Sequence, residues 1–170
     1  MTPQTILAES VAATKQLTAR YLAGFTDDDR TRQAENLPNH VAWNLGHLAL
    51  TMHRIAEKID GKPIPASDIG PAGTASVYAN EAVAFGSKPA GDTAAYPPLA
   101  RCIEIYNNAC DRLAGAVRAA PDAKLTEVVK WGAFEFPLHA MVSRMVFHNG
   151  FHTGQIADLR PAFGFKSIFS

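Results

Sequence analysis

The sequence predicts an all-α protein: an up-down-down-up four-helix bundle with one long connection between its second and third helices. Four segments of about 20 residues carry apolar side chains at helical spacing. The stretch 61–98 between the second and third segments is rich in Pro and Gly and offers no second core. The chain has 170 residues and is 47% hydrophobic, which is enough for one sizeable core. We therefore expect a single domain over residues 1–170.

The first helix is predicted from Thr2 to Ala23. Thr2 can cap its start, and Pro3 suits the first helical position. The apolar residues that recur at helical spacing along it are Ile6, Ala13, Leu17 and Tyr21. The polar stretch 26–35 that follows is predicted to be a loop, in which the acidic run 27–29 lies in solvent.

The second helix is predicted to follow Pro38, with Asn39 as its N-cap, and to end at Asp60 and Gly61. Its main apolar side has the spacing of an antiparallel bundle. The residues of this side are Val41, Leu45, Leu48, Met52, Ile55 and Ile59. A second apolar edge runs beside it through Trp43, His47 and Leu50. Helices with two apolar sides usually pack on both, which favours a bundle interior and a subunit interface.

The connection 61–98 is long for a compact domain, so we expect it to be functional or to contain short elements of its own. One such element is a short helix from Ser76 to Phe85. The third helix is predicted from Leu99 to Ala119. Its apolar residues are Leu99, Cys102, Ile103, Tyr106, Cys110, Leu113 and Val117.

The segment from Leu125 to Phe136 is rich in β-branched and aromatic residues, and Gly132 interrupts it. This pattern predicts a small β-hairpin. The fourth helix should begin near Pro137 and end before Pro161. Its apolar stripe contains Leu138, Met141, Met145, His148, His152, Ile156 and Leu159.

Charge and composition exclude several classes of protein. The formal net charge is +0, with 16 basic and 16 acidic residues, which argues against nucleic-acid binding. No apolar run approaches the roughly 18 residues of a membrane span, and the N-terminus lacks a secretory signature. Cys102 and Cys110 lie about 12 Å apart along one predicted helix, too far for a disulfide. They are expected to be core thiols in a cytoplasmic protein.

His148 and His152 lie one helical turn apart in the centre of the fourth helix's apolar stripe. Buried imidazoles need polar partners. One interpretation is a pair of neutral core histidines, each hydrogen-bonded to a nearby polar group. A shared metal ion would satisfy both rings at once, at about 2.0–2.1 Å for zinc. The pairing in one stripe favours the metal.

A third ligand should come from another helix. The other histidines are His40, His47, His53 and His139. His139 projects off the fourth helix's stripe, His53 points away from the second helix's main apolar side, and His40 lies at an exposed helix start. His47 is the best candidate, since it lies one turn or less from the second helix's main apolar side, beside Trp43, Asn44 and Leu50. It and His152 each lie about 12 Å from the same end of the bundle if the second and fourth helices are antiparallel. That arrangement requires a long crossover, which residues 61–98 supply.

Other metal and phosphate signatures are absent. The sequence has no His-Glu-x-x-His motif, no Glu-x-x-His pairs of the di-iron type and no glycine-rich phosphate loop. A site made of three neutral imidazoles would leave a divalent ion its full positive charge.

Two segments resemble the DinB-like (DinB/YfiT-like) metalloprotein superfamily. Residues 39–48 are similar to the family's helix-two segment that ends in a ligand, here His47. Residues 148–155 are similar to its His-x-x-x-His-Arg-Gly-Gln motif, with Thr153 in place of the usual Arg. The resemblance implies an up-down-down-up bundle, a metal triad of His47, His148 and His152, and frequent homodimers. It also implies S-transferases or isomerases that use low-molecular-weight thiols, although Thr153 keeps the substrate class open.

Two functions follow. The first is a metal-dependent enzyme acting on a small molecule, either a thiol-dependent S-transferase or a related transferase or hydrolase, with Zn, Ni or Fe as the ion. Tyr78, Tyr96 or Glu135 would then line the mouth of the site, and Asn44 and Gln155 would orient ligands. The alternative is a non-catalytic, metal-stapled bundle that acts as a dimeric small-ligand-binding or stress-response protein. Neither function involves nucleic acid or a membrane.

Overall fold

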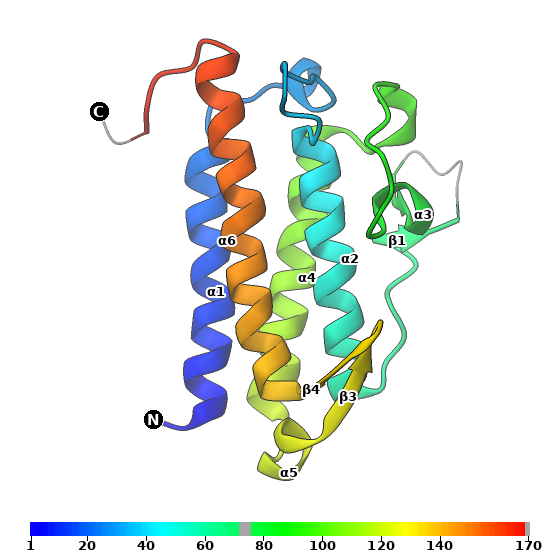
Figure 1. Cartoon of the computed structure of the whole chain (residues 1–170), viewed down its shortest axis with the longest axis vertical. Coiled ribbons are helices and arrows are strands. Elements are labelled where there is room, and N and C mark those ends of the chain that lie inside the picture. The colour runs from blue at the N-terminus through cyan, green and yellow to red at the C-terminus, as the bar shows by residue number, and fades with distance from the viewer. Residues whose placement is uncertain (72–75, 169–170) are drawn as a thin grey trace.

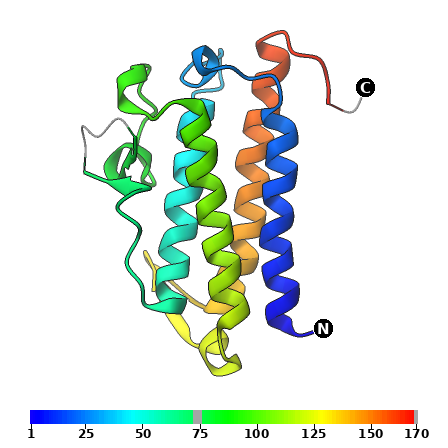
Figure 2. The same ribbon diagram turned by 180° about the vertical axis from the view of Figure 1, so that it is seen from behind.

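The computed structural model describes residues 1–71 and 76–168, and most of them are helical, which confirms the prediction of an all-α fold. Its long helices are α1 (Pro3–Leu22), α2 (Val41–Asp60), α4 (Leu99–Ala119) and α6 (Leu138–Ala162). α1 and α6 run in one direction and α2 and α4 in the other (Figures 1 and 2). Both α1 and α2 pack against α4 and α6. No helix in the described part of the chain is long and apolar enough to cross a membrane.

Short elements connect these helices. They are η1 (Asp27–Asp29), β1 (Ile69–Gly70), β2 (Tyr78–Ala79), α3 (Asn80–Val83), η2 (Thr93–Ala95), α5 (Asp122–Thr126), β3 (Val128–Trp131) and β4 (Phe134–Pro137). β1 and β2 pair in parallel, whereas β3 and β4 form an antiparallel hairpin in which Lys130 lies opposite Glu135. The short helix expected over 76–85 is only α3. Residues 72–75 of the expected crossover lie outside the described residues.

The helix ends differ from the predicted ones in two places. The cap of α2 is His40 and not Asn39, because the His40 Nδ1 accepts a hydrogen bond from the Trp43 amide at 3.1 Å. α6 continues to Ala162 and includes Pro161, which removes a backbone hydrogen bond only from the last turn. The C-cap Gly61 has φ of 70°, a conformation that favours glycine.

The buried face of α1 is not the predicted one. Ile6 and Leu17 are 51% and 49% exposed. The residues that face the bundle are Ala8, Val11, Thr14, Thr18 and Leu22. The two threonines are tolerated there because their hydroxyls donate to carbonyls one turn back in α1. Because the buried face of α1 is partly polar, the spacing of its apolar residues did not indicate which face packs against the bundle.

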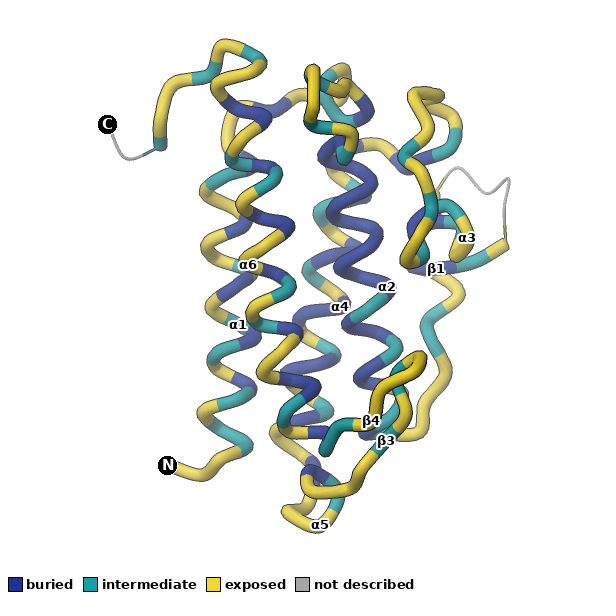
Figure 3. The backbone as a smooth tube through the Cα atoms, in the orientation of Figure 1, coloured by how far each residue is buried: buried dark blue, intermediate teal, exposed yellow. Residues whose placement is uncertain are grey.

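α2 is buried almost throughout, and Figure 3 shows it dark along most of its length. All residues of its predicted main apolar side are buried. Its second edge, with Trp43 and Leu50, is buried as well, and α3 from the crossover packs on this helix. The chain thus covers α2 without a second subunit, and the homodimer stays a prediction. Cys102 and Cys110 are free, buried thiols, as expected.

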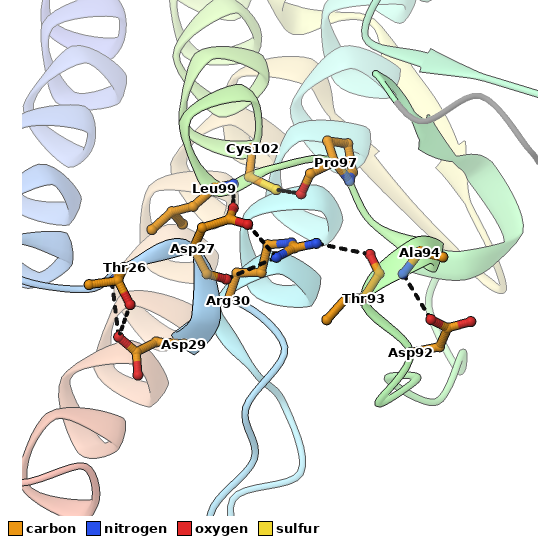
Figure 4. A network of polar contacts seen from close by, with 10 residues as sticks. All are labelled: Thr26, Asp27, Asp29, Arg30, Asp92, Thr93, Ala94, Pro97, Leu99 and Cys102. Carbon is orange, nitrogen blue, oxygen red and sulfur yellow. Dashed lines mark hydrogen bonds and ion pairs between the residues drawn. The ribbon is translucent and has the colours of Figure 1, made fainter.

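The connection between α1 and α2 is tied to the start of α4 and to η2 (Figure 4). The Asp27 carboxylate accepts a hydrogen bond from the Leu99 amide at 2.7 Å, so it satisfies a free N–H at the start of α4. Arg30 bonds to that carboxylate at 2.6 Å and to the Thr93 carbonyl at 3.2 Å. The acidic run is therefore not simply a solvated loop, because it fixes the end of the bundle at which α2 begins.

Candidate metal centre

Three histidines from two antiparallel helices converge in the bundle. His47 lies in the second turn of α2, and His148 and His152 lie on α6. The His148 Nε2 is 3.3 Å from the His47 Nε2 and 3.1 Å from the His152 Nε2. One nitrogen from each ring lies within 4.8 Å of the other two, and the group could hold a metal ion. Two nitrogens bound tetrahedrally to zinc would lie about 3.3–3.4 Å apart, close to these distances.

Hydrogen bonds to the Nδ1 atoms of His47 and His152 fix which nitrogen of each ring carries the proton. The His47 Nδ1 lies 2.8 Å from the Val83 carbonyl oxygen, which can only accept. The His152 Nδ1 lies 2.7 Å from the Asn44 Oδ1, and the Asn44 amide nitrogen donates to the carbonyls of Asn39 and His40, which sets the amide's orientation. Both Nδ1 atoms therefore donate, and both Nε2 atoms present bare lone pairs to the same point.

His148 completes the group from the more exposed side. Within the described residues, its buried Nδ1 has no hydrogen-bond partner. Its Nε2 faces the two lone pairs, and one imidazole proton cannot satisfy both. A cation at the shared point would satisfy all three nitrogens, so the donor set fits a divalent metal ion.

Burial keeps these rings neutral. Burial, together with a smaller effect of the neighbouring histidines, lowers the pKa of His148 to about 4 and that of His152 to about 3. Burial also lowers the pKa of His47. Trp43 stacks on the His47 ring with a centroid distance of 4.8 Å and an interplanar angle of 6°. Neutral imidazole is the form that binds metal, so the three rings are ready to bind near pH 7.

The remaining histidines lie outside this group. His40 is fully buried, contrary to the expected exposed position, because its ring caps α2 and packs on Tyr96 at 4.7 Å. His53 is also buried, with its Nε2 3.3 Å from an Asp68 carboxylate oxygen, since the crossover covers that side of α2. His139 is exposed.

Two of the three residues expected at the mouth of the site are in the core. Tyr78 is fully buried and donates to the Ala42 carbonyl at 2.8 Å, and Tyr96 is buried and accepts from the Ala90 amide. Glu135 is exposed on the β3–β4 hairpin and lines an open cavity of about 540 Å³ there. Asn44 and Gln155 do orient His152, as expected. The Val83 carbonyl was missed, because a backbone atom leaves no signal in the sequence.

Thr153 faces away from the three histidines. It is 6% exposed, and its hydroxyl lies 2.8 Å from that of Thr18 on α1. The Thr18 hydroxyl lies in turn 3.0 Å from that of Tyr106 on α4. The residue at this position therefore packs in the interior of the bundle and does not line the candidate metal centre.

Comparison with known proteins identifies related sequences and folds. The sequence model of the DinB superfamily matches residues 11–156. A crystal structure described as the conserved protein of locus from Enterococcus faecalis is similar to this chain, with a TM-score of 0.72 and 12% identity. The similarity covers 95% of this chain and 97% of that one. At that identity, the likeness shows the fold alone. No curated protein matches the chain.

Proposed function

The chain belongs to the DinB superfamily, and on that premise we propose that it is a divalent-metal-dependent enzyme acting on a small molecule, built on an up-down-down-up bundle. His47, His148 and His152 would hold the ion. The reaction would be thiol-dependent S-transfer or a related transfer or hydrolysis. The observation that carries the proposal is the convergence of two proton-free Nε2 atoms, fixed by the Val83 carbonyl and the Asn44 amide oxygen, on a third imidazole.

The residues around the centre suit catalysis better than a closed structural site. A Zn, Ni or Fe dication held there would supply a Lewis acid that favours the deprotonated form of a water or thiol. Three neutral imidazoles do not offset its charge, and three protein ligands leave coordination positions open. His148 is only partly buried, so the centre lies close to the protein surface on that side. Asn44 and Gln155 accept from the His152 Nδ1 and so hold His152 in the tautomer whose Nε2 is free to bind the ion.

Arg54 supports a substrate with an anionic group. It lies two turns after His47 on the same face of α2, and long helical side chains lean back toward the N-terminus. Asn80 holds its guanidinium through a neutral amide oxygen at 3.0 Å. Within the described residues, no carboxylate forms an ion pair with it. Such a cation can bind a carboxylate of the substrate while the reacting atom lies at the centre.

A second candidate function is a metal-stapled bundle without catalysis, as a dimer or a small-ligand-binding protein. It is favoured by Phe147 and Phe151, which lie next to the candidate ligands on α6 and are 76% and 56% exposed. Exposed aromatic side chains at one-turn spacing form an apolar surface that a second subunit or a ligand could cover.

Metal content and turnover test both functions. Protein purified without a nickel column should contain about one divalent ion per chain, and the His152→Ala variant should contain far less. The His139→Ala variant is the matched control, because that histidine is on the same helix and exposed. Wild-type protein should turn over an electrophile with one member of a panel of low-molecular-weight thiols, and His152→Ala should not. Activity that survives in His152→Ala would exclude the metal mechanism, whereas bound metal without turnover would favour the stapled bundle.

A further inference from the structure

The crossover residues 78–96, here named the strap, lie beside the first turns of α2 (Figure 1), and the Val83 carbonyl within them contacts the His47 ring. We infer that the strap is a positioning element for His47, so that seating the strap on α2 and binding a metal ion stabilise each other. The inference rests on the proposed role of His47 as a ligand, and it assigns a task to a segment that carries none of the three histidines.

Three ring N–H groups, two on α2 and one on its N-cap His40, donate hydrogen bonds to the strap. The donors, His40, Trp43 and His47, are three and four residues apart on one face of the helix. Their acceptors, at positions 90, 87 and 83, are also three and four residues apart, so the strap runs antiparallel to α2 here. The His40 Nδ1 accepts from a backbone amide, so its Nε2 is the donor. The three hydrogen bonds join His40 to the Ala90 carbonyl at 3.0 Å, Trp43 to the Ser87 hydroxyl at 3.0 Å and His47 to the Val83 carbonyl at 2.8 Å.

Gly46 allows the strap to approach this closely. A Cβ atom at position 46 would lie 2.5 Å from a ring carbon of Tyr78 and 2.8 Å from the Val83 Cγ1. Real side-chain atoms do not approach so closely, and both neighbours are buried. The Val83 carbonyl therefore reaches the His47 ring because the preceding residue has no side chain.

Only one of the three rings depends on the strap. The acceptors of His152 are Asn44 and Gln155, which belong to α2 and α6 themselves. His47 has its acceptor on the strap, and without it the ring loses the bond that keeps its Nε2 free of a proton. Removing the group that accepts a hydrogen bond from the other ring nitrogen of a metal-binding histidine typically weakens metal binding by about 10–100-fold. Because linkage is reciprocal, the metal ion must stabilise the seated strap by the same factor.

Hydrogen exchange and zinc affinity together test the linkage. In the wild type, zinc should slow amide exchange in residues 78–96. The Gly46→Ala variant should exchange faster there and bind zinc about 10–100-fold more weakly in competition with a chromogenic chelator. Gly115→Ala on α4 is the matched control, because nothing lies within 4 Å of a Cβ there, and it should change neither quantity. Ser87→Ala, which adds no steric clash, should act in the same direction as Gly46→Ala, and Ser87→Thr should restore the wild-type values.

The outcomes separate this inference from the proposed function. If the wild type binds zinc but strap exchange does not respond to it, the inference is wrong and the metal centre stands. The same conclusion follows if Gly46→Ala and Ser87→Ala loosen the strap while zinc affinity stays at the wild-type value. If the wild type binds no zinc, nickel or iron, both the proposed function and the inference fail.

Discussion

Replacing Thr153 by Arg should destabilise the protein severely, although the related family motif usually has Arg at this position. The side chain is 6% exposed, and its hydroxyl bonds to that of Thr18 at 2.8 Å. Thr153→Val replaces this hydroxyl with a methyl group. Thr18 keeps its bonds to Tyr106 and to the Thr14 carbonyl, so the cost should be about 1 kcal/mol.

Arg adds two costs to that loss. The longer side chain must enter a packed interior, at about 1–3 kcal/mol. Its charge would lie beside the Thr18 hydroxyl, which cannot neutralise it, at about 3–5 kcal/mol. With the lost hydrogen bond, the sum of about 5–9 kcal/mol is comparable to the whole stability of a typical domain, about 5–15 kcal/mol. Thr153→Arg should therefore be largely unfolded or melt far below the wild type.

Urea unfolding followed by circular dichroism measures these differences, with zinc and with chelator. Ser143→Arg is the control, because that residue is exposed on the same helix and Arg there should be nearly neutral. A stable Thr153→Arg protein would refute the reasoning. So would a gain of activity on anionic substrates, because it would mean that the residue at position 153 reaches the metal centre.

Two further predictions concern the side chains of His53 and Arg54 on α2. Burial lowers the pKa of His53 from 6.5 to about 4, so the unfolded chain takes up the proton first as the pH falls. The contribution of neutral His53 to the unfolding free energy should be complete above about pH 6.5 and should be lost as the pH falls toward 4. In urea titrations, the wild-type unfolding free energy should therefore fall between about pH 7.5 and 4.5, and His53→Gln should make that fall about 2–3 kcal/mol smaller. Equal pH dependence in both proteins would contradict this. For Arg54, replacement by Gln should raise KM about 10-fold or more for anionic substrates and leave kcat and neutral substrates unchanged, since a charge-assisted bond contributes about 1.5–3 kcal/mol. A similar loss for neutral substrates would argue against an anion-binding role.

The sequence predicted the three converging histidines because the position of each along its helix follows from residue spacing. His148 and His152 share a stripe that can be recognised from spacing alone. His47 followed from its place beside the main apolar side of the second helix. Its depth there matches that of His152 in the fourth helix if the two helices are antiparallel. Side-chain depth along a helix is fixed by the rise per residue, so this inference needs no knowledge of packing.

The errors have a common physical origin in contacts between distant segments. His40 and His53 looked exposed or misdirected on α2 alone, but the crossover covers both. The register of α1 was wrong because Thr14 and Thr18 are polar in sequence yet satisfied in the core by Asn149 and Tyr106. Periodicity detects a buried face only when that face is apolar, and it carries no information about a Pro/Gly-rich segment that folds back on a helix.

The positions of the three histidines along the chain have a consequence for the order of synthesis. His47 is separated from His148 by 101 residues, and its strap is complete well before α6 begins. A nascent chain that lacks α6 carries one imidazole of the three and cannot gain stability from the ion. Binding stabilises only the state that binds, so a metal ion would favour finished chains over truncated ones. Only chains synthesised beyond residue 152 would then be stabilised by the metal ion. A chain stopped before residue 148 would show no metal-dependent resistance to proteases.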